Sequence, residues 1–234
     1  MSLKGKVTVV LGASGTVGSG IARKIADEGA TVAVVSRREE GLEKIKKYLK
    51  GKESQLFTFV ADVAKVEGAA KFRDAILAKY NKIDHVFSSI GGWDNSGPIT
   101  TLTYEQVQKA FQTYTLSHWS VAKAFLGNRK EEDTGLTIIT GGAGGFVIDI
   151  NASVVTTAVA GLFGLSLALR KEFEKTKARV NELRIQVFVK EEGQAGGSVL
   201  DHRDIGKVAV NIAKSTARGK LILINNKDDI NQSI

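Results

Sequence analysis

Runs of apolar, β-branched residues alternate with stretches of helical periodicity along the whole chain, and this alternation constrains the fold more than any other feature. The runs typical of strands cover residues 6–12, 31–36, 56–61, 83–89, 136–140, 180–189 and 220–224. Between them, apolar residues recur at the spacing of one helical face, most clearly over 16–28, 104–126, 152–173 and 205–216. Alternating strands and helices are typical of a parallel sheet covered on both faces. We therefore predict an α/β fold, with a parallel seven-stranded sheet flanked by helices in one doubly wound domain over residues 1–234.

A glycine-rich turn, Gly12-Ala13-Ser14-Gly15-Thr16-Val17-Gly18, joins the first strand to the first helix. Glycines at this junction let the backbone approach a pyrophosphate, and free N–H groups at the helix start bind the anion. A glycine-rich turn alone is a weak signal, but here it follows a strand and opens an amphipathic helix. We therefore predict a Rossmann domain whose dinucleotide contacts include Gly12, Ser14, Gly15, Thr16, Val17 and Gly18.

The end of the second strand carries Ser36-Arg37-Arg38, where an NAD site usually places an acidic residue. Arginine instead suits a 2′-phosphate, because its planar guanidinium makes charge-assisted hydrogen bonds to phosphate. These residues predict NADP(H) as the cofactor, bound by Ser36, Arg37 and Arg38. The alternative is a pair of surface arginines that merely start a helix.

Charge and composition exclude several classes of protein. The net charge is +8, but the lysines lie on helices with interleaved acids, as over 43–47, so we expect no nucleic-acid partner. No apolar run approaches the ~20 residues of a membrane span, so we expect no membrane partner. The chain has no cysteine, which fits a cytoplasmic protein, and its 3 histidines lack metal-ligand spacing, so we expect no metal.

Four further fragments resemble the short-chain dehydrogenase/reductase family in order and spacing. They are Asp62-Val63, Ser88-Ser89-Ile90-Gly91, the stretch 159–164 and Arg179-Val180-Asn181. The resemblance implies a small-molecule substrate and a homodimer or homotetramer. It also implies that Asp62 contacts the adenine amino group. The remaining predicted cofactor contacts lie at or after the ends of the third, fourth and fifth strands: Asp62, Val63, Ser89, Ile90, Gly91 and Thr140.

The active-site residues that the resemblance implies are missing from this chain. Aligning on Gly164 places Val155 where the family has its Tyr and Val159 where it has its Lys. The family's Ser falls on Gly142, and its helix Asn falls on Tyr114. The glycines of the turn also stand at first, fourth and seventh places, as in divergent members of the family. The usual proton relay is therefore unavailable.

Tyr114 and His118 are the candidate catalytic residues that remain. They are four apart on one predicted helix, so they share a face and are expected to form a proton-donor pair beside the cleft. The alternative is that both pack in a subunit interface. Trp93, after the fourth strand, either lines the substrate site or anchors a loop, and 191–199 stands where the family carries a lid.

These residues support three hypotheses. The first is a divergent NADP(H)-dependent short-chain oxidoreductase that transfers a hydride to or from a small carbonyl, alcohol or alkene. The second is a non-catalytic NADP(H)-binding sensor or partner protein, because a fold does not fix a function. The third is a cyclase or isomerase without redox chemistry.

Overall fold

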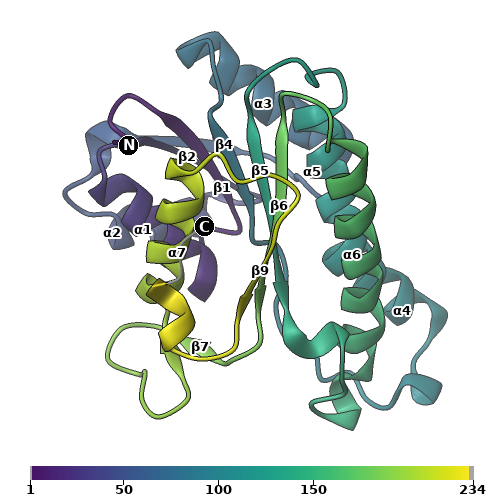
Figure 1. The fold of residues 1–234 in the computed structure, drawn as a ribbon. Helices are drawn as coiled ribbons and strands as arrows, with labels where there is room; N and C mark the ends of the chain where they lie inside the picture. The colour runs from purple at the N-terminus through teal and green to yellow at the C-terminus, as the bar shows by residue number, and fades with distance from the viewer. Residues whose placement is uncertain (1, 232–234) are drawn as a thin grey trace.

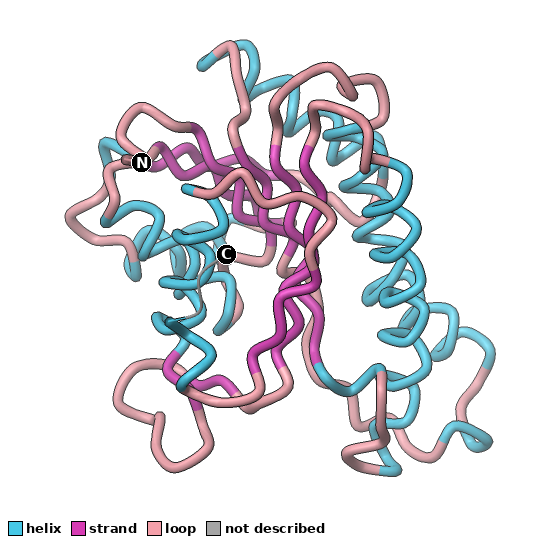
Figure 2. Tube along the Cα trace, viewed as in Figure 1, coloured by secondary structure: helices cyan, strands magenta, loops and turns pink. Residues whose placement is uncertain are grey.

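The computed structural model describes residues 2–231 and has one parallel sheet at its centre (Figures 1 and 2). Its strands are β1 (Val7–Leu11), β2 (Thr31–Ser36), β3 (Leu56–Val60), β4 (His85–Ser88), β5 (Gly135–Gly141), β6 (Arg179–Ile185) and β9 (Leu221–Ile224). They form a 7-stranded sheet in the order β3-β2-β1-β4-β5-β6-β9. This confirms the predicted doubly wound sheet. The strand order reverses between β1 and β4, which is where such sheets bind ligands.

Helices cover both faces of the sheet. Figure 1 shows one layer formed by α1 (Thr16–Asp27), α2 (Glu39–Tyr48) and α7 (His202–Lys214). The other layer contains α3 (Val66–Tyr80), α4 (Tyr104–Phe111), α5 (Ser117–Leu126) and α6 (Ser153–Glu172). Because side chains alternate along a strand, Val10 packs in the core under the first layer, while Val9 and Leu11 pack under the second.

The predicted sixth strand, 180–189, is wrong at its end. Strand β6 stops at Ile185, and the Gln186 N–H makes its last bond to the sheet, at 2.8 Å from Ile224 O. The chain then leaves the sheet and forms β7 (Val189–Lys190), which pairs with β8 (Leu200–Asp201) in a separate 2-stranded sheet. The segment 191–199 therefore joins two short strands.

The predicted long helix over 104–126 is interrupted by a π-helical turn, Gln112–Leu116, between α4 and α5. The Ser117 hydroxyl donates to Thr113 O at 2.6 Å, and the Thr115 hydroxyl donates to Ala158 O at 2.6 Å. A hydroxyl that bonds back to a carbonyl of its own helix, as that of Ser117 does, weakens the regular helical ladder. Helical periodicity alone does not reveal such a turn.

Helix α6 is more apolar than the sequence analysis allowed. Within residues 2–231, Ile150–Glu172 is long and apolar enough to cross a bilayer, with a mean hydropathy of 1.9. This corrects the expectation that no apolar run approaches that length. Half of its most apolar window is buried inside the protein. The core helix of a soluble protein meets the same criteria, so length and hydropathy alone do not indicate a membrane span.

Helices α1 and α7 cross at two glycines. A Cβ on Gly20 would lie 2.1 Å from His202 O, and a Cβ on Gly206 would lie 2.3 Å from Gly20 O. These distances are far inside van der Waals contact, so the crossing tolerates no side chain at either position. The contact fixes the start of α7 against the first turns of α1.

We expect Gly206→Ala to destabilise the protein by about 2 kcal/mol, because the methyl group forces the two helices apart. The melting temperature should fall by roughly 5 °C, measured by circular dichroism. Gly164→Ala is the matched control, because a Cβ on Gly164 in α6 meets nothing within 4 Å. Equal melting temperatures for the two variants would show that α1 and α7 do not pack as closely at Gly206 as the structure indicates.

Candidate cofactor and active site

The glycine-rich turn is shaped by two close backbone contacts. Gly12 has φ +77°, a left-handed conformation that favours glycine, and a Cβ there would lie 2.1 Å from Ser89 O. A Cβ on Gly18 would lie 2.2 Å from Gly12 O, while the Gly15 N–H donates to Gly12 O at 3.0 Å. The turn therefore needs glycine at 12 and 18 for space and holds its shape through its own backbone.

The N-terminus of α1 is left open by this turn. Gly15 is the N-cap, no side chain caps the helix, and its first turn contains no acidic residue. The first helical bond runs from the Ser19 N–H to Gly15 O at 2.9 Å, so the N–H groups of Thr16, Val17 and Gly18 precede it. Free amides at the positive end of a helix are suited to a phosphate. The turn thus fits the pyrophosphate of a dinucleotide.

The residues predicted to bind the 2′-phosphate lie together at the end of β2. The Ser36 hydroxyl accepts from the Arg38 N–H at 3.3 Å, and a Cβ on Gly41 would collide with that hydroxyl at 2.2 Å. Arg37 and Arg38 are both exposed. Arg38 pairs loosely with Glu40 at 3.9 Å, whereas the Arg37 guanidinium has no ion pair or hydrogen bond within residues 2–231. Arg37 is therefore free to bind an anion.

The predicted adenine contacts, Asp62 and Val63, follow β3. The Ala61 N–H donates to Ser36 O at 3.0 Å, so this segment lies beside the end of β2. One carboxylate oxygen of Asp62, Oδ1, accepts from the Ala64 N–H at 3.2 Å, and both residues are half-buried. This places Asp62 and Val63 next to the end of β2.

His118 is buried under the loop that follows β4 and does not face the cleft. Its Nε2 lies 2.9 Å from Ile90 O, an acceptor, so Nε2 carries the proton and Nδ1 accepts from the Ser88 hydroxyl at 2.8 Å. Burial lowers the pKa of His118 to about 4, and its bond to Ile90 O offsets this only in part. Both nitrogens are occupied in a neutral ring, so the predicted donor pair with Tyr114 does not form; His118 instead positions Ile90.

Tyr114 lies in the π-helical turn, and its ring faces Gly91: a Cβ built on Gly91 would lie 3.7 Å from it. Burial, together with the charge of Asp94, raises the pKa of Tyr114 to about 12, so the phenol is protonated at neutral pH. Its hydroxyl has no partner within residues 2–231 and is not sealed from solvent. Of the two candidate catalytic residues, Tyr114 alone presents a free donor.

The positions that correspond to the family's Ser, Tyr and Lys are apolar. Val155 and Val159 are buried in one cluster with the Tyr114 ring. Gly142 is buried too, and a Cβ there would lie 3.2 Å from Gln186 Cα and 3.4 Å from the Phe146 ring. These positions offer no proton and no positive charge.

The side chain of Thr140 does not make the cofactor contact that the sequence predicted. Its hydroxyl donates to Glu182 Oε1 at 2.8 Å and is buried inside the sheet layer. Glu182 is itself fully buried, and Arg184 donates to it at 2.8 Å while stacking on the Phe163 ring at 3.5 Å. The Thr140 side chain therefore contributes to a polar core behind the site and not to the cofactor surface.

One buried residue beside the site, His202, was not among the predicted site residues. The residue is the first of α7 and is fully buried beside the glycine-rich turn. Asp201 is the N-cap of that helix, and its carboxylate accepts from the Arg203 N–H at 2.8 Å. An Asp just before the apolar pattern that begins at Ile205 is the signal that would have placed His202 on the helix.

Comparisons with known proteins agree with this geometry. A family model described as short chain dehydrogenase matches residues 6–189. The chain belongs to the short-chain dehydrogenase/reductase family. It is 32% identical to the NADP-dependent mannitol dehydrogenase of Aureobasidium melanogenum over 194 residues, covering 78% of this chain and 70% of that one. It is also 32% identical to an oxidoreductase of Listeria monocytogenes over 106 residues, which are 45% of this chain and only 42% of the relative.

Solved short-chain dehydrogenases share the fold. A short chain dehydrogenase from Bacillus anthracis superimposes with a TM-score of 0.83 at 20% identity, covering 96% of both chains. The alcohol dehydrogenase of Thermococcus sibiricus, solved with 5-hydroxy-NADP, gives a TM-score of 0.79 at 22% identity and covers 94% of this chain and 96% of that one. At such identities the likeness concerns the fold. Within residues 2–231, no group of three or more His, Asp or Glu is arranged to hold a metal.

The buried histidines predict an acid-sensitive fold. The pKa of His118 is lowered to about 4 and that of His85 to about 3, against about 6.5 in the unfolded chain. The unfolded state therefore binds more protons below pH 6.5, and the free energy of unfolding should fall by about 1.4 kcal/mol per pH unit for each histidine as pH drops toward 4.

Urea unfolding of the wild type and of His118→Gln between pH 7 and pH 4.5 measures this effect. As pH falls below 6.5, we expect the free energy of unfolding of the variant to decrease by about 1 kcal/mol less per pH unit than that of the wild type. Parallel pH profiles for the two proteins would show that His118 is not buried as a neutral ring.

Proposed function

We propose that this short-chain dehydrogenase/reductase is an NADP(H)-dependent oxidoreductase that interconverts a small carbonyl compound and its alcohol, or reduces an alkene. The observation that carries the proposal is an uncapped N-terminus of α1 together with an exposed Arg37 that makes no ion pair within residues 2–231. The helix N-terminus suits a pyrophosphate, and the arginine suits a 2′-phosphate. The NADP dependence of the Aureobasidium relative supports the same choice of cofactor.

In this proposal, the chain binds the cofactor through four groups of residues. The N–H groups of 16–18 hold the pyrophosphate, Arg37 and Arg38 bind the 2′-phosphate, and Asp62 accepts from the adenine amino group. The backbone of Ser89, Ile90 and Gly91 supports the nicotinamide half, with Ile90 held by His118. When bound, the nicotinamide supplies or accepts the hydride.

Tyr114 provides the proton. Its phenol is protonated at neutral pH and its hydroxyl is not sealed from solvent, so Oη donates to the oxygen of a carbonyl substrate and regains a proton from water. The position where the family has its lysine is Val159, so no ammonium group there lowers the pKa of Tyr114. We therefore propose slow turnover.

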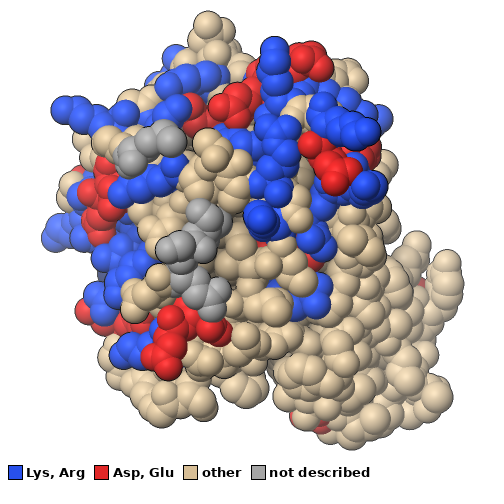
Figure 3. Space-filling view, in the orientation of Figure 1, with Lys and Arg blue, Asp and Glu red and all other residues tan. Residues whose placement is uncertain are grey.

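The loops around the site favour an apolar, uncharged substrate. Gly97 N–H donates to Asn151 O at 2.9 Å, so the loops after β4 and β5 lie side by side at the carboxyl edge of the sheet. Seven large apolar residues in these loops and after β6 are between 38% and 63% exposed: Trp93, Ile99, Phe146, Val147, Ile148, Ile150 and Phe188. The loops contain no Lys or Arg, and Figure 3 shows few charged side chains at the lower right, where the β5 loop lies in Figure 1. An anionic substrate would find no positive partner there.

Calorimetry with NADPH and NADH tests the cofactor. We expect Arg37→Glu to weaken NADPH binding roughly 10- to 100-fold, because a charge-assisted bond to the 2′-phosphate is replaced by repulsion. Binding of NADH should stay unchanged, and Lys175→Glu, an equal change of charge at an exposed residue far along the chain, should change neither. NADH binding as tight as NADPH binding in the wild type would contradict the choice of NADP(H).

NADPH oxidation with a panel of medium-chain ketones and aldehydes tests the chemistry. We expect Tyr114→Phe to lower kcat at least about 100-fold, since it removes the proton donor, while the Kd for NADPH changes less than twofold. Tyr104→Phe is the control, because Tyr104 is 76% exposed in α4. Retained turnover in Tyr114→Phe would exclude it as the donor.

A second candidate function is a non-catalytic NADP(H)-binding sensor or partner protein, and the valines at 155 and 159 favour it. Tight NADPH binding with no hydride transfer to any acceptor would select this function. Product formation by protein stripped of cofactor would instead select a cyclase or isomerase.

We also propose a cytoplasmic homodimer or homotetramer that acts on a small molecule, without nucleic acid or membrane. Leu116, Trp119 and Leu167, which are between 44% and 62% exposed on the π-helical turn, α5 and α6, support association of subunits along these helices.

A further inference from the structure

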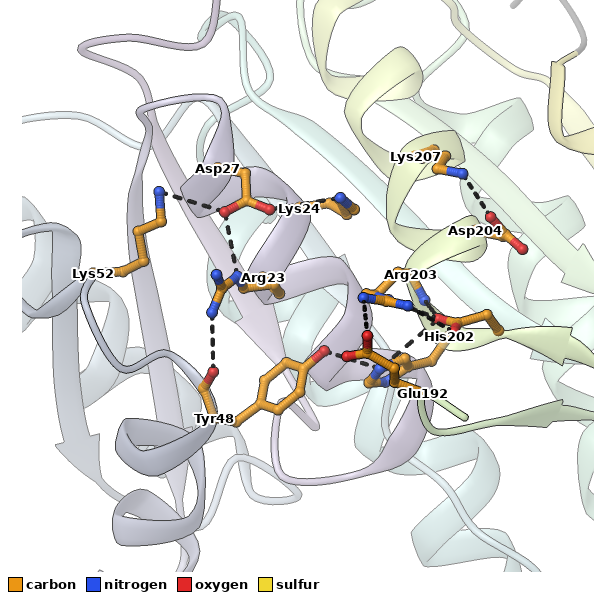
Figure 4. Close-up of polar contacts among 11 residues, drawn as sticks. Arg23, Lys24, Asp27, Tyr48, Lys52, Glu192, His202, Arg203, Asp204 and Lys207 are labelled. Atoms are coloured by element: carbon orange, nitrogen blue, oxygen red, sulfur yellow. Dashed lines mark hydrogen bonds and ion pairs between the residues drawn. The ribbon is translucent and has the colours of Figure 1, made fainter. Parts of the chain in front are cut away.

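His202 joins three helices next to the glycine-rich turn. Its side chain has no exposed surface, and its backbone carbonyl lies against Gly20 of α1. Figure 4 shows the imidazole between Tyr48 of α2 and the start of α7, with α1 beside it. His202 is not among the residues that we assign to cofactor binding or to proton transfer. A separate role is therefore needed to explain why this polar ring is buried.

The contacts of the ring determine its tautomer. Nδ1 lies 3.0 Å from Thr16 O and 3.0 Å from the Ser19 hydroxyl, which itself donates to Thr16 O at 2.8 Å. A carbonyl only accepts, so Nδ1 carries the proton and donates toward these two oxygens. Nε2 is then an acceptor and receives the Tyr48 hydroxyl at 2.9 Å. Every polar position of the buried ring is therefore used.

The acceptors of Nδ1 belong to the part of α1 that binds the pyrophosphate in our proposed function. Thr16 is the first residue of α1 and Ser19 the fourth, so the bonds from His202 bracket the free N–H groups of 16–18. A site for an anion has to hold its donors within about 0.5 Å of the binding geometry, and buried hydrogen bonds from outside the helix provide that restraint.

The ring is itself held from the other side. His202 directly follows β8, and Arg203 bonds to Asp201 at 3.1 Å and to Glu192 at 2.6 Å. Lys44 of α2 lies 3.9 Å from Glu191. These ion pairs link Arg203, the residue after His202, to Asp201 and to the segment 191–199, and so help to anchor the backbone that carries the imidazole.

We propose that His202 is a positioning residue for the cofactor: its Nδ1–H bonds hold the first turn of α1 in the conformation that binds the pyrophosphate. This inference rests on the proposed function, because it needs a dinucleotide at that turn. It assigns to α7, which contributes no predicted cofactor contact, a direct part in cofactor affinity.

Two variants that each keep half of the ring's hydrogen bonds test the proposal. Asn at 202 can place an N–H where Nδ1–H stands, whereas Gln places its amide nearer to Nε2. By calorimetry we expect His202→Asn to bind NADPH within about threefold of the wild type and His202→Gln to bind about tenfold more weakly, the loss of roughly one hydrogen bond.

A second ligand separates positioning from general damage. Adenosine 2′-monophosphate carries the 2′-phosphate but no pyrophosphate, so His202→Gln should leave its affinity unchanged. Equal losses for both ligands, or no loss for NADPH, would overturn the proposal. Failure of the wild type to bind NADPH would instead overturn the proposed function, and the role of His202 in cofactor binding with it.

Nitrogen-15 NMR of the wild-type imidazole provides a test that does not depend on any variant folding. We expect His202 to carry its proton on Nδ1 at neutral pH. A proton on Nε2 would contradict the bond to Thr16 O and so the proposal.

Discussion

The close approach of Gly12 to Ser89 is the constraint on which the site depends. Only a glycine with positive φ allows the end of β1 to pass within contact of the loop after β4. The same loop is fixed at Ile90 by His118 and lies against Tyr114 at Gly91. The phosphate-binding turn and the candidate proton donor therefore share one backbone segment, and a side chain at position 12 would disturb both together.

Paired neutral groups and one buried ion cluster stabilise the polar interior. His118 of α5 is hydrogen-bonded to Ser88 of β4, and His85 of β4 to Thr137 of β5, in both cases without net charge. Glu182 is the exception, and it lies between Arg184 at 2.8 Å and Arg170 at 3.7 Å. Because an unpaired buried carboxylate is costly, these residues depend on one another. Through Phe163, which packs on Gly144, Arg184 also supports the loop after β5.

The parallel seven-stranded sheet and its covering of helices on both faces followed from the alternating pattern, because hydrophobic period and parallel pairing determine them together. The glycine-rich turn was equally predictable, since its glycines have backbone roles. The side chains of Thr140 and His118 were not, because a linear pattern does not say which partner a buried polar group will find. His202 was missed for the same reason: its partners, Thr16, Ser19 and Tyr48, are distant in sequence.

The π-helical turn at 112–116 has a consequence for insertions and deletions. A π-helical turn accommodates one extra residue in an α-helix, and each residue of an α-helix turns the chain by about 100°. Deleting one residue here would rotate α5 against α4, so that Tyr114 in the turn and His118 in α5 could no longer both reach the loop after β4. The number of residues between the helix caps Thr103 and Gly127 is therefore as much a part of this site as the side chains of Tyr114 and His118.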